Sequence, residues 1–193
     1  MREMIRKVLM VALAILVAWA FAAPAGEPWD ALRQGGVVIL MRHSITEPGT
    51  GDPPGFRPGD CQTQRNLSRI GRVQAQRMGT LLASHGVQPV GVLSSAWCRC
   101  VDTARLAFPS VPVRHFSALD SLFMDTGRGP AQTAALREAV GRIAPSGVTV
   151  WVTHQVNVTA LTGEYLGMGE ALVLRPDGAG SFQMLGRLIP PEH

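Results

Sequence analysis

Short apolar runs alternate along the chain with longer segments of helical period. Residues 37–41 (VVILM) are five consecutive apolar residues that follow two glycines and begin with two β-branched side chains. A short, unbroken run of this kind is typical of a strand buried on both faces of a parallel sheet. Further strands are predicted at 90–93, 111–115 and 148–153, and a closing hairpin at 171–174 and 182–189.

The segments between these strands have the spacing of amphipathic helices. Ser68 is predicted to cap a helix that reaches Ser84 and stops at Gly86. Its core-facing side is predicted to carry Ile70, Val73, Met78, Leu81 and Leu82. Further helices are predicted over 96–107, from Pro130 to the break at 145–147, and over 156–166. This order predicts an α/β domain with three layers, α/β/α, around a mostly parallel central sheet.

Residues 46–60 form the longest stretch without a periodic pattern, and they contain four prolines and four glycines. Loops of this length inside compact domains are usually functional. The sequence therefore predicts a functional loop directly after the first strand.

The first 25 residues have a pattern of their own. Arg2, Arg6 and Lys7 precede an apolar run from residue 8 to 23, and small residues around Pro24 follow. This order predicts a signal peptide over residues 1–25, with the domain occupying residues 26–193. The interpretation implies export, to the periplasm in a bacterium, without stable membrane insertion after cleavage. An uncleaved anchor is the alternative, because the run is near the lower limit for spanning a bilayer.

Composition narrows the range of partners. The formal charge of +4 falls to +2 without Arg2, Glu3, Arg6 and Lys7, and Lys7 is the only lysine. This charge is too small and too scattered to indicate nucleic-acid binding. Three cysteines suggest one disulfide in an oxidising compartment, joining Cys61 to Cys98 or Cys100. A zinc site is the alternative, although no CxxC pair or spaced histidine pair is present.

Three of the predicted strands end in residues of similar chemistry. The first strand leads into Arg42 and His43, the second into a helix that contains Arg99, and the fourth into His154. If these strands are parallel neighbours, the four side chains meet at the edge of the sheet where α/β proteins bind ligands. Two guanidiniums and two imidazoles suit a dianion such as a phosphoryl group. A neutral imidazole can also act as a nucleophile toward phosphorus, and no carboxylate cluster is available to hold a metal.

The motifs around these residues resemble those of the histidine phosphatase superfamily, which includes phosphoglycerate mutase. The resemblance covers nearly the whole chain after the signal. It rests on four segments in order: LMRH at 40–43, NLSRIGRVQA at 66–75, SSAWCRCVDTA at 94–104 and VTH at 152–154. The resemblance implies a phosphoglycerate mutase-like fold and a phosphohistidine intermediate on His43. The residues themselves predict no cofactor.

The resemblance also implies roles for the neighbouring residues. Arg42, Arg99 and His154 would complete the phosphate pocket. Ser44 stands where family members usually have glycine, and Gln155 where they often have glycine or serine. Both are predicted to bind substrate, as is Arg65, which follows the long loop.

A phosphomonoester needs a proton donor for its leaving group. Asp120 falls where many family members place this acid, and Asp125 and Glu47 are the other candidates. The competing interpretation is that Asp120 only caps a turn.

Together these observations predict a metal-independent phosphatase for a phosphomonoester, such as a sugar phosphate or a phosphate on a cell-envelope glycan. Two alternatives are a protein phosphohistidine phosphatase and a non-catalytic phosphate-binding envelope protein on the same fold. A distance from Asp120 to the pocket too great for proton donation would favour the phosphohistidine phosphatase.

Overall fold

The computed structural model describes residues 28–123 and 126–192. The predicted signal peptide therefore lies outside the described residues, as does Asp125. Within the described residues, no helix is long and apolar enough to cross a membrane.

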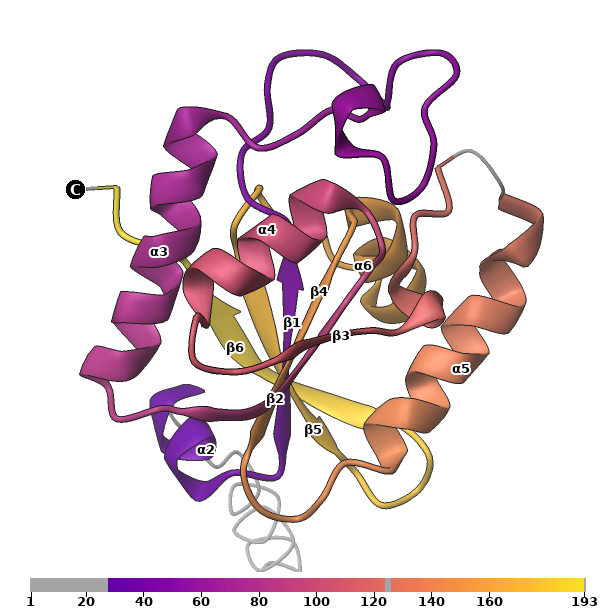
Figure 1. The fold of residues 1–193 in the computed structure, drawn as a ribbon. Coiled ribbons are helices and arrows are strands. Elements are labelled where there is room, and N and C mark those ends of the chain that lie inside the picture. Colours follow the sequence, from indigo (N-terminus) through magenta and orange to yellow (C-terminus); the bar gives the residue numbers. More distant parts are fainter. Residues whose placement is uncertain (1–27, 124–125, 193) are drawn as a thin grey trace, which may run out of the picture.

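A six-stranded sheet in the order β3-β2-β4-β1-β5-β6 forms the centre of the fold (Figure 1). Strands β3, β2, β4 and β1 are mutually parallel, whereas β5 and β6 pair antiparallel as the predicted hairpin. The strands are β1 (Val37–Arg42), β2 (Pro89–Ser94), β3 (Val113–His115), β4 (Val148–Thr153), β5 (Ala171–Pro176) and β6 (Phe182–Leu188). The predicted α/β class with a mostly parallel sheet is confirmed.

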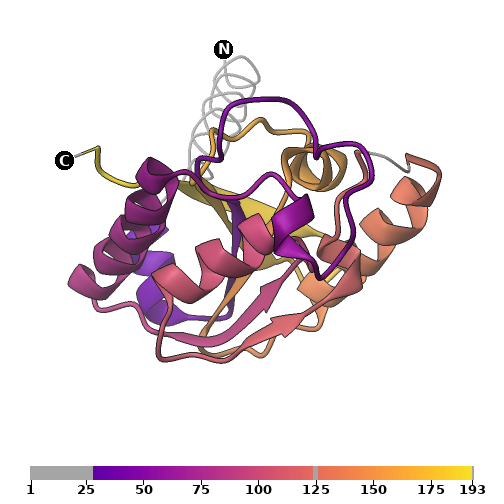
Figure 2. The same ribbon diagram turned by 45° about the horizontal axis from the view of Figure 1, so that its top comes forward.

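Helices cover both faces of this sheet (Figures 1 and 2). Helices α2 (Pro28–Gln34), α3 (Arg69–Ser84) and α4 (Cys98–Ala107) lie on one face, and α5 (Gly129–Gly141) and α6 (Gln155–Thr162) lie on the other. Three short 3-10 turns, Cys61–Thr63, Ser117–Leu119 and Thr126–Arg128, interrupt the connections. Helix α2 had no counterpart in the sequence prediction.

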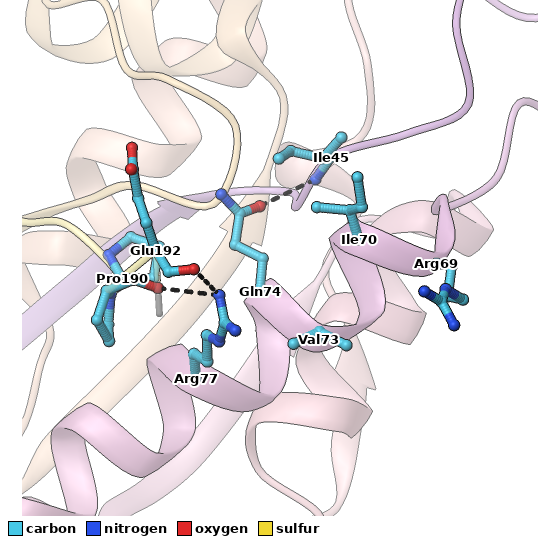
Figure 3. Close-up of a pocket in the computed structure, with 9 residues that line it drawn as sticks. Ile45, Arg69, Ile70, Val73, Gln74, Arg77, Pro190 and Glu192 are labelled. Atoms are coloured by element: carbon cyan, nitrogen blue, oxygen red, sulfur yellow. Dashed lines mark hydrogen bonds between the residues drawn. The ribbon is translucent and has the colours of Figure 1, made fainter.

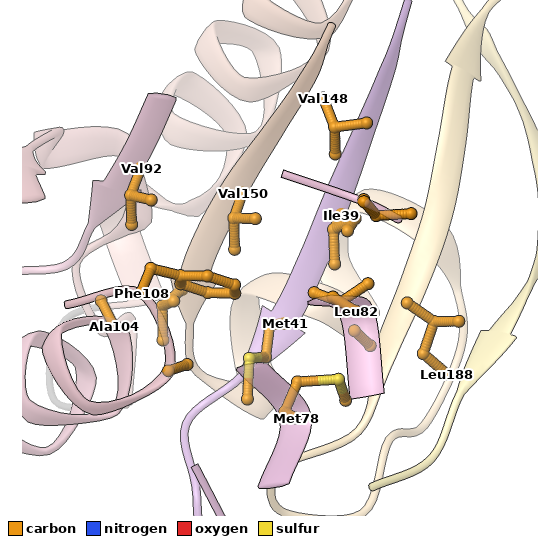
Figure 4. Close-up of a cluster of buried hydrophobic side chains, with 14 of the residues drawn as sticks. Ile39, Met41, Met78, Leu82, Val92, Ala104, Phe108, Val148, Val150 and Leu188 are labelled. Atoms are coloured by element: carbon orange, nitrogen blue, oxygen red, sulfur yellow. The ribbon is translucent and has the colours of Figure 1, made fainter. Parts of the chain in front are cut away.

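The apolar run of β1 supplies both cores because side chains alternate between the faces of a strand. Val37, Ile39 and Met41 belong to the cluster under α3 and α4 (Figure 4), and Val38 and Leu40 to the cluster under α5 and α6. All five side chains are fully buried. This two-sided burial explains why the sequence of β1 is continuously apolar.

The predicted core-facing side of α3 is partly wrong. Ile70 and Val73 are 67% and 40% exposed, and they line a groove of about 540 Å³ beside the carboxyl-terminal segment (Figure 3). The buried side of the helix instead combines small residues with larger ones: Gly71, Ala75, Met78 and Leu82. Small residues face inward there because backbone from other segments packs directly on the helix.

Gly79 shows how closely α3 and α4 pack. A Cβ atom on Gly79 would lie 2.0 Å from the carbonyl oxygen of Ala107, which is a backbone overlap. We expect Gly79→Ala to lower the free energy of unfolding by roughly 1–3 kcal/mol. Gly141→Ala is the matched control, because Gly141 is also helical and its Cβ would meet open space.

Urea unfolding of the two variants and the wild type measures this difference. Gly141→Ala should stabilise the fold by up to about 1 kcal/mol, since alanine restricts the unfolded chain. Equal stability of Gly79→Ala and the wild type would show that the helices can separate without cost.

Candidate active site

The strands that carry the predicted site residues are direct neighbours in the sheet. Strand β4 lies between β2 and β1, and all three are parallel. Their carboxyl ends are in register, because Arg42 pairs with Thr153 and Ser94 with Val152. The loop of residues 46–60 passes over these strand ends (Figures 1 and 2). The predicted convergence at this edge is therefore observed.

A cavity of about 280 Å³ lies at this edge. Five of the predicted site residues line it: Arg42, His43, Arg65, Arg99 and His154. Gln155 lines it as well, although its amide bonds to Thr159, Glu164 and Leu166. The remaining lining residues are Thr50, Gly51, Asp52, Trp97, Ser121, Phe123 and Val156.

His43 is held in the tautomer that a nucleophile requires. Its Nδ1 lies 2.9 Å from the carbonyl oxygen of Ser44, so Nδ1–H donates to this oxygen and Nε2 keeps its lone pair. The Ser44 N–H in turn donates to Oγ1 of Thr103 at 3.0 Å. Ser44 is fully buried and lies outside the cavity lining, so in this structure it orients His43.

His154 faces His43 across the cavity, with 5.5 Å between the ring centroids. Its Nε2 lies 2.8 Å from the hydroxyl of Ser95, and its Nδ1 lies 3.4 Å from NH2 of Arg99. Since a guanidinium can only donate, Nδ1 is the acceptor and Nε2 carries the proton. Each named residue of the motif Ser-x-x-x-Arg-x-x-x-Thr thus contributes to the site. Ser95 bonds to His154, Arg99 lines the cavity, and Thr103 accepts the N–H of Ser44.

Arg42 and Arg99 both have donors without a protein acceptor. NH1 of Arg42 donates to the carbonyl oxygen of Leu166 at 2.7 Å, and Tyr165 lies under the guanidinium. NH1 of Arg99 donates to Asp52. Among the described residues, the buried Nε atoms of both arginines have no hydrogen-bond partner. Buried unpaired donors are rare, and these two belong to arginine side chains that line the cavity.

Burial sets the charge of the two histidines. Burial, with further contributions from Arg99 and Arg42 against an opposing hydrogen bond to Ser44, lowers the pKa of His43 to about 3. Burial and the charge of Arg99 hold the pKa of His154 well below its ordinary value. Both rings are therefore neutral at physiological pH, which leaves the lone pair of His43 free to react.

These low pKa values make the stability of the fold depend on pH. Below the ordinary histidine value of 6.5, the unfolded chain binds protons that the folded chain does not bind, so the free energy of unfolding falls as pH falls. Between pH 7 and 4.5 we expect His43 to account for a loss of about 2 kcal/mol. Denaturant unfolding of the wild type and His43→Asn across this range measures it. An equal pH dependence in both proteins would contradict the burial of a neutral His43.

Asp120 does not reach the cavity. Its Oδ1 accepts the N–H of Ala96 at 2.8 Å, and both carboxylate oxygens lie 3.1 Å from Nε2 of His115. The carboxylate thus caps the turn before α4, which was the competing interpretation. Glu47 is not among the cavity-lining residues either.

Sequence reasoning missed Asp52, whose carboxylate pairs with Arg99 inside the cavity. The only signal for it was its place in the long proline- and glycine-rich loop. The disulfide joins Cys61 to Cys98, one of the two predicted pairings, and attaches the end of this loop to the start of α4. Cys100 is free and buried, and burial raises the pKa of its thiol to about 12. Among the described residues, no three His, Cys, Asp or Glu side chains form a group that could hold a metal ion.

The fold and the site define a three-layer α/β protein with a histidine- and arginine-lined anion cavity at the carboxyl edge of its parallel strands. The family model of the histidine phosphatase superfamily (branch 1) matches residues 38–141, and the chain belongs to this superfamily. His154 lies beyond the matched range and is placed by the structure. No curated protein sequence is similar enough to the chain to be matched with it.

Several solved structures share the fold. Phosphoserine phosphatase from Entamoeba histolytica, in complex with 3-phosphoglyceric acid, aligns with a TM-score of 0.59 and 15% identity over 81% of this chain and 98% of its own. Alpha-ribazole phosphatase from Shigella flexneri aligns with a TM-score of 0.58 and 15% identity over 81% and 96%. The protein histidine phosphatase SixA, complexed with tungstate, aligns with a TM-score of 0.58 and 17% identity over 80% and 97%. These likenesses support the fold, and all three structures are of phosphatases.

Proposed function

We propose that this protein is a metal-independent phosphatase that transfers a phosphoryl group first to Nε2 of His43 and then to water. The arrangement of His43 opposite His154, in a cavity that also contains Arg42 and Arg99, is the observation that carries this proposal. The guanidiniums of Arg42 and Arg99 add to it, because the planar donor fork of arginine suits phosphoryl oxygens.

The chemistry divides into two displacements at phosphorus. In the first, the lone pair on Nε2 of His43 forms the N–P bond, the bond from phosphorus to the leaving group breaks, and the leaving group takes up a proton from solvent. In the second, a water oxygen attacks phosphorus, the N–P bond breaks, and the proton of the water is released to solvent. Arg42 and Arg99 stabilise the charge on the phosphoryl oxygens in both steps.

The proposed substrate class is a phosphomonoester, with a sugar phosphate or a cell-envelope glycan phosphate as the leading candidate. This choice follows from a further proposal: residues 1–25 are a signal peptide, and the domain works in the periplasm. The charged and apolar pattern of that segment supports the proposal. Mass spectrometry of the protein recovered from the periplasm of an expressing bacterium tests it, since retention of residues 1–25 would contradict cleavage.

One observation favours a second candidate, hydrolysis of phosphohistidine. Among the described residues that line the cavity, Asp52 is the only carboxylate, and both of its oxygens accept hydrogen bonds. Asp120 is not among the lining residues, and its carboxylate bonds to Ala96 and His115. An imidazole leaves phosphorus more readily than an alkoxide without a proton donor, so this cavity is compatible with an N–P bond as substrate.

A substrate panel separates the candidates. It contains sugar phosphates, an aryl phosphate and a phosphohistidine peptide, each with and without a chelator, and phosphate release is measured. Faster hydrolysis of sugar phosphates would support the phosphomonoesterase, and hydrolysis of the peptide alone would support the alternative. Loss of activity with the chelator, restored by zinc or magnesium, would contradict a metal-independent mechanism.

A further inference from the structure

Asp52 is a buried carboxylate inside a cavity that suits anions, and the proposed chemical steps do not use it. It lies in the 46–60 loop, yet its side chain is only 5% exposed, as is that of Arg99. A buried carboxylate beside a phosphate pocket repels an anionic ligand, so its presence there calls for another explanation. Its contacts indicate what that explanation is.

Every hydrogen bond that Asp52 accepts comes from a part of the active site. Oδ1 accepts NH1 of Arg99 at 2.7 Å and the backbone N–H of Arg65 at 3.0 Å. Oδ2 accepts the indole N–H of Trp97 at 2.9 Å. Trp97 is the residue before α4 and packs edge-on against His154, with 5.5 Å between ring centroids. The carboxylate thus connects the long loop to the start of the helix that carries Arg99.

We propose that Asp52 is a positioning residue that fixes the guanidinium of Arg99 for the phosphoryl group, and that it is not the proton donor for the leaving group. This inference rests on the proposed phosphatase function. Arginine has a long side chain with several rotatable bonds, so an unrestrained guanidinium would sample many orientations. Asp52 holds NH1 from one side, NH2 faces Nδ1 of His154 at 3.4 Å, and Nε remains without a protein acceptor.

The ionisation of Asp52 fits positioning and opposes proton donation. Burial alone would raise the pKa of Asp52, but hydrogen bonds and charge from Arg99, with hydrogen bonds from Arg65 and Trp97, lower it below its ordinary value. A carboxylate that is ionised and bonded through both oxygens has no proton to give. With neutral histidines, the three arginines of the cavity and Asp52 leave a net charge of +2, which matches a dianionic phosphoryl group.

The loop that carries Asp52 is fastened to the same helix at a second point. The disulfide joins Cys61 to Cys98, the residue before Arg99. The amide oxygen of Gln64 also accepts the backbone N–H of Cys98 at 3.0 Å. A disulfide and a hydrogen bond therefore hold the segment after Asp52 against the start of the helix that carries Arg99. A positioning role for Asp52 requires such a fixed arrangement.

The test compares kcat/KM for two phosphomonoesters with different leaving groups. One is the aryl ester p-nitrophenyl phosphate, and the other is a simple alkyl phosphate. We expect Asp52→Ala to lower kcat/KM by about 10- to 100-fold, by the same factor for both substrates. Asp52→Asn should recover part of the lost activity, because the amide oxygen still accepts from Arg99, although the amide NH2 group cannot accept from Trp97. The inhibition constant for inorganic phosphate should rise from the wild type to Asp52→Asn and again to Asp52→Ala. Asp102→Asn is the matched control: Asp102 also pairs with an arginine, Arg72, but outside the cavity.

A double-mutant cycle separates positioning from a purely structural role. In an Arg99→Met background, Asp52→Ala should change kcat/KM by less than about threefold, because the group that it positions is gone. Arg99→Gln, which also removes the guanidinium, replaces Arg99→Met if thermal unfolding shows that the methionine variant is not folded. If the loss in the double variant equals the product of the two single losses, the residues act independently and the inference is wrong. Wild-type activity of Asp52→Ala would also overturn it.

The leaving-group comparison tests the second half of the proposal. If Asp52→Ala loses much more activity toward the alkyl phosphate than toward p-nitrophenyl phosphate, then Asp52 is the proton donor and the inference is wrong. Failure of the wild type to hydrolyse any substrate or to become phosphorylated would instead contradict the proposed function. In that case calorimetric binding of inorganic phosphate to the wild type and Asp52→Ala still tests positioning, with equal affinities counting against it.

Discussion

His43→Asn is expected to abolish turnover, with kcat reduced by at least about 10⁴-fold. The substitution removes Nε2, the atom that forms the N–P bond, and no other group can take over covalent catalysis at that position. Asparagine is chosen because its amide N–H can still donate to the carbonyl oxygen of Ser44, as Nδ1 does now. The strand end therefore keeps its hydrogen bond while the nucleophile is lost.

Covalent labelling provides an independent measurement of the same prediction. Brief incubation with a phosphodonor, followed by an alkaline quench, should leave an acid-labile phosphate on the wild type and none on His43→Asn. His85→Asn is the control, since His85 lies at the end of α3, stacks on Trp29 and is absent from the cavity lining. Equal labelling of His43→Asn and the wild type would place the phosphoryl group on another residue.

The location of the residues that follow the parallel strands could be predicted from the sequence, because each residue is adjacent in the chain to the strand that positions it. The apolar run of β1 defines a buried strand, and the chain direction places Arg42 and His43 at its carboxyl end. The same reasoning holds for His154 after β4. Once parallel pairing is assumed, strand ends meet at one edge without knowledge of any loop. This is why the histidine and arginine positions agreed with the structure.

Asp120 and Asp52 show where that reasoning fails. Their side-chain positions depend on paths of irregular chain, which no periodic pattern encodes. Asp120 satisfies the N–H of Ala96, a contact between residues 24 apart that chain position alone does not reveal. The loop that carries Asp52 is fastened at Cys61, and the sequence did not distinguish Cys98 from Cys100 as the disulfide partner.

The prediction of which side of α3 faces the core was partly wrong for a different reason. Apolar spacing placed Ile70 and Val73 inside, but the inward positions belong to Gly71 and Ala75. A Cβ atom on Gly71 would lie 1.8 Å from the carbonyl oxygen of Ile45, so only glycine allows the helix to approach the segment after β1. Close backbone packing reverses the usual rule that large apolar residues face the core, and hydrophobicity alone does not show it.

Arg42→Met is expected to lower kcat/KM by about 10²- to 10³-fold, the second largest effect among these variants. Arg42 follows β1 directly, and its guanidinium is held by Leu166 and Tyr165 with Nε left unpaired. Unlike Arg99, it has no carboxylate partner within salt-bridge distance among the described residues, so its removal leaves no buried carboxylate unpaired. The loss should therefore appear in catalysis and in phosphate affinity, with little change in stability.

Steady-state kinetics, inhibition by inorganic phosphate and thermal unfolding measured on the same preparations test this expectation. Arg42→Lys should recover only part of the activity, because an ammonium keeps the charge but cannot offer the planar donor fork of a guanidinium. Arg105→Met is the control, since Arg105 is an exposed arginine on α4 outside the cavity. If Arg42→Met lost stability but kept its phosphate affinity, Arg42 would support the strand end and would not bind the phosphoryl group.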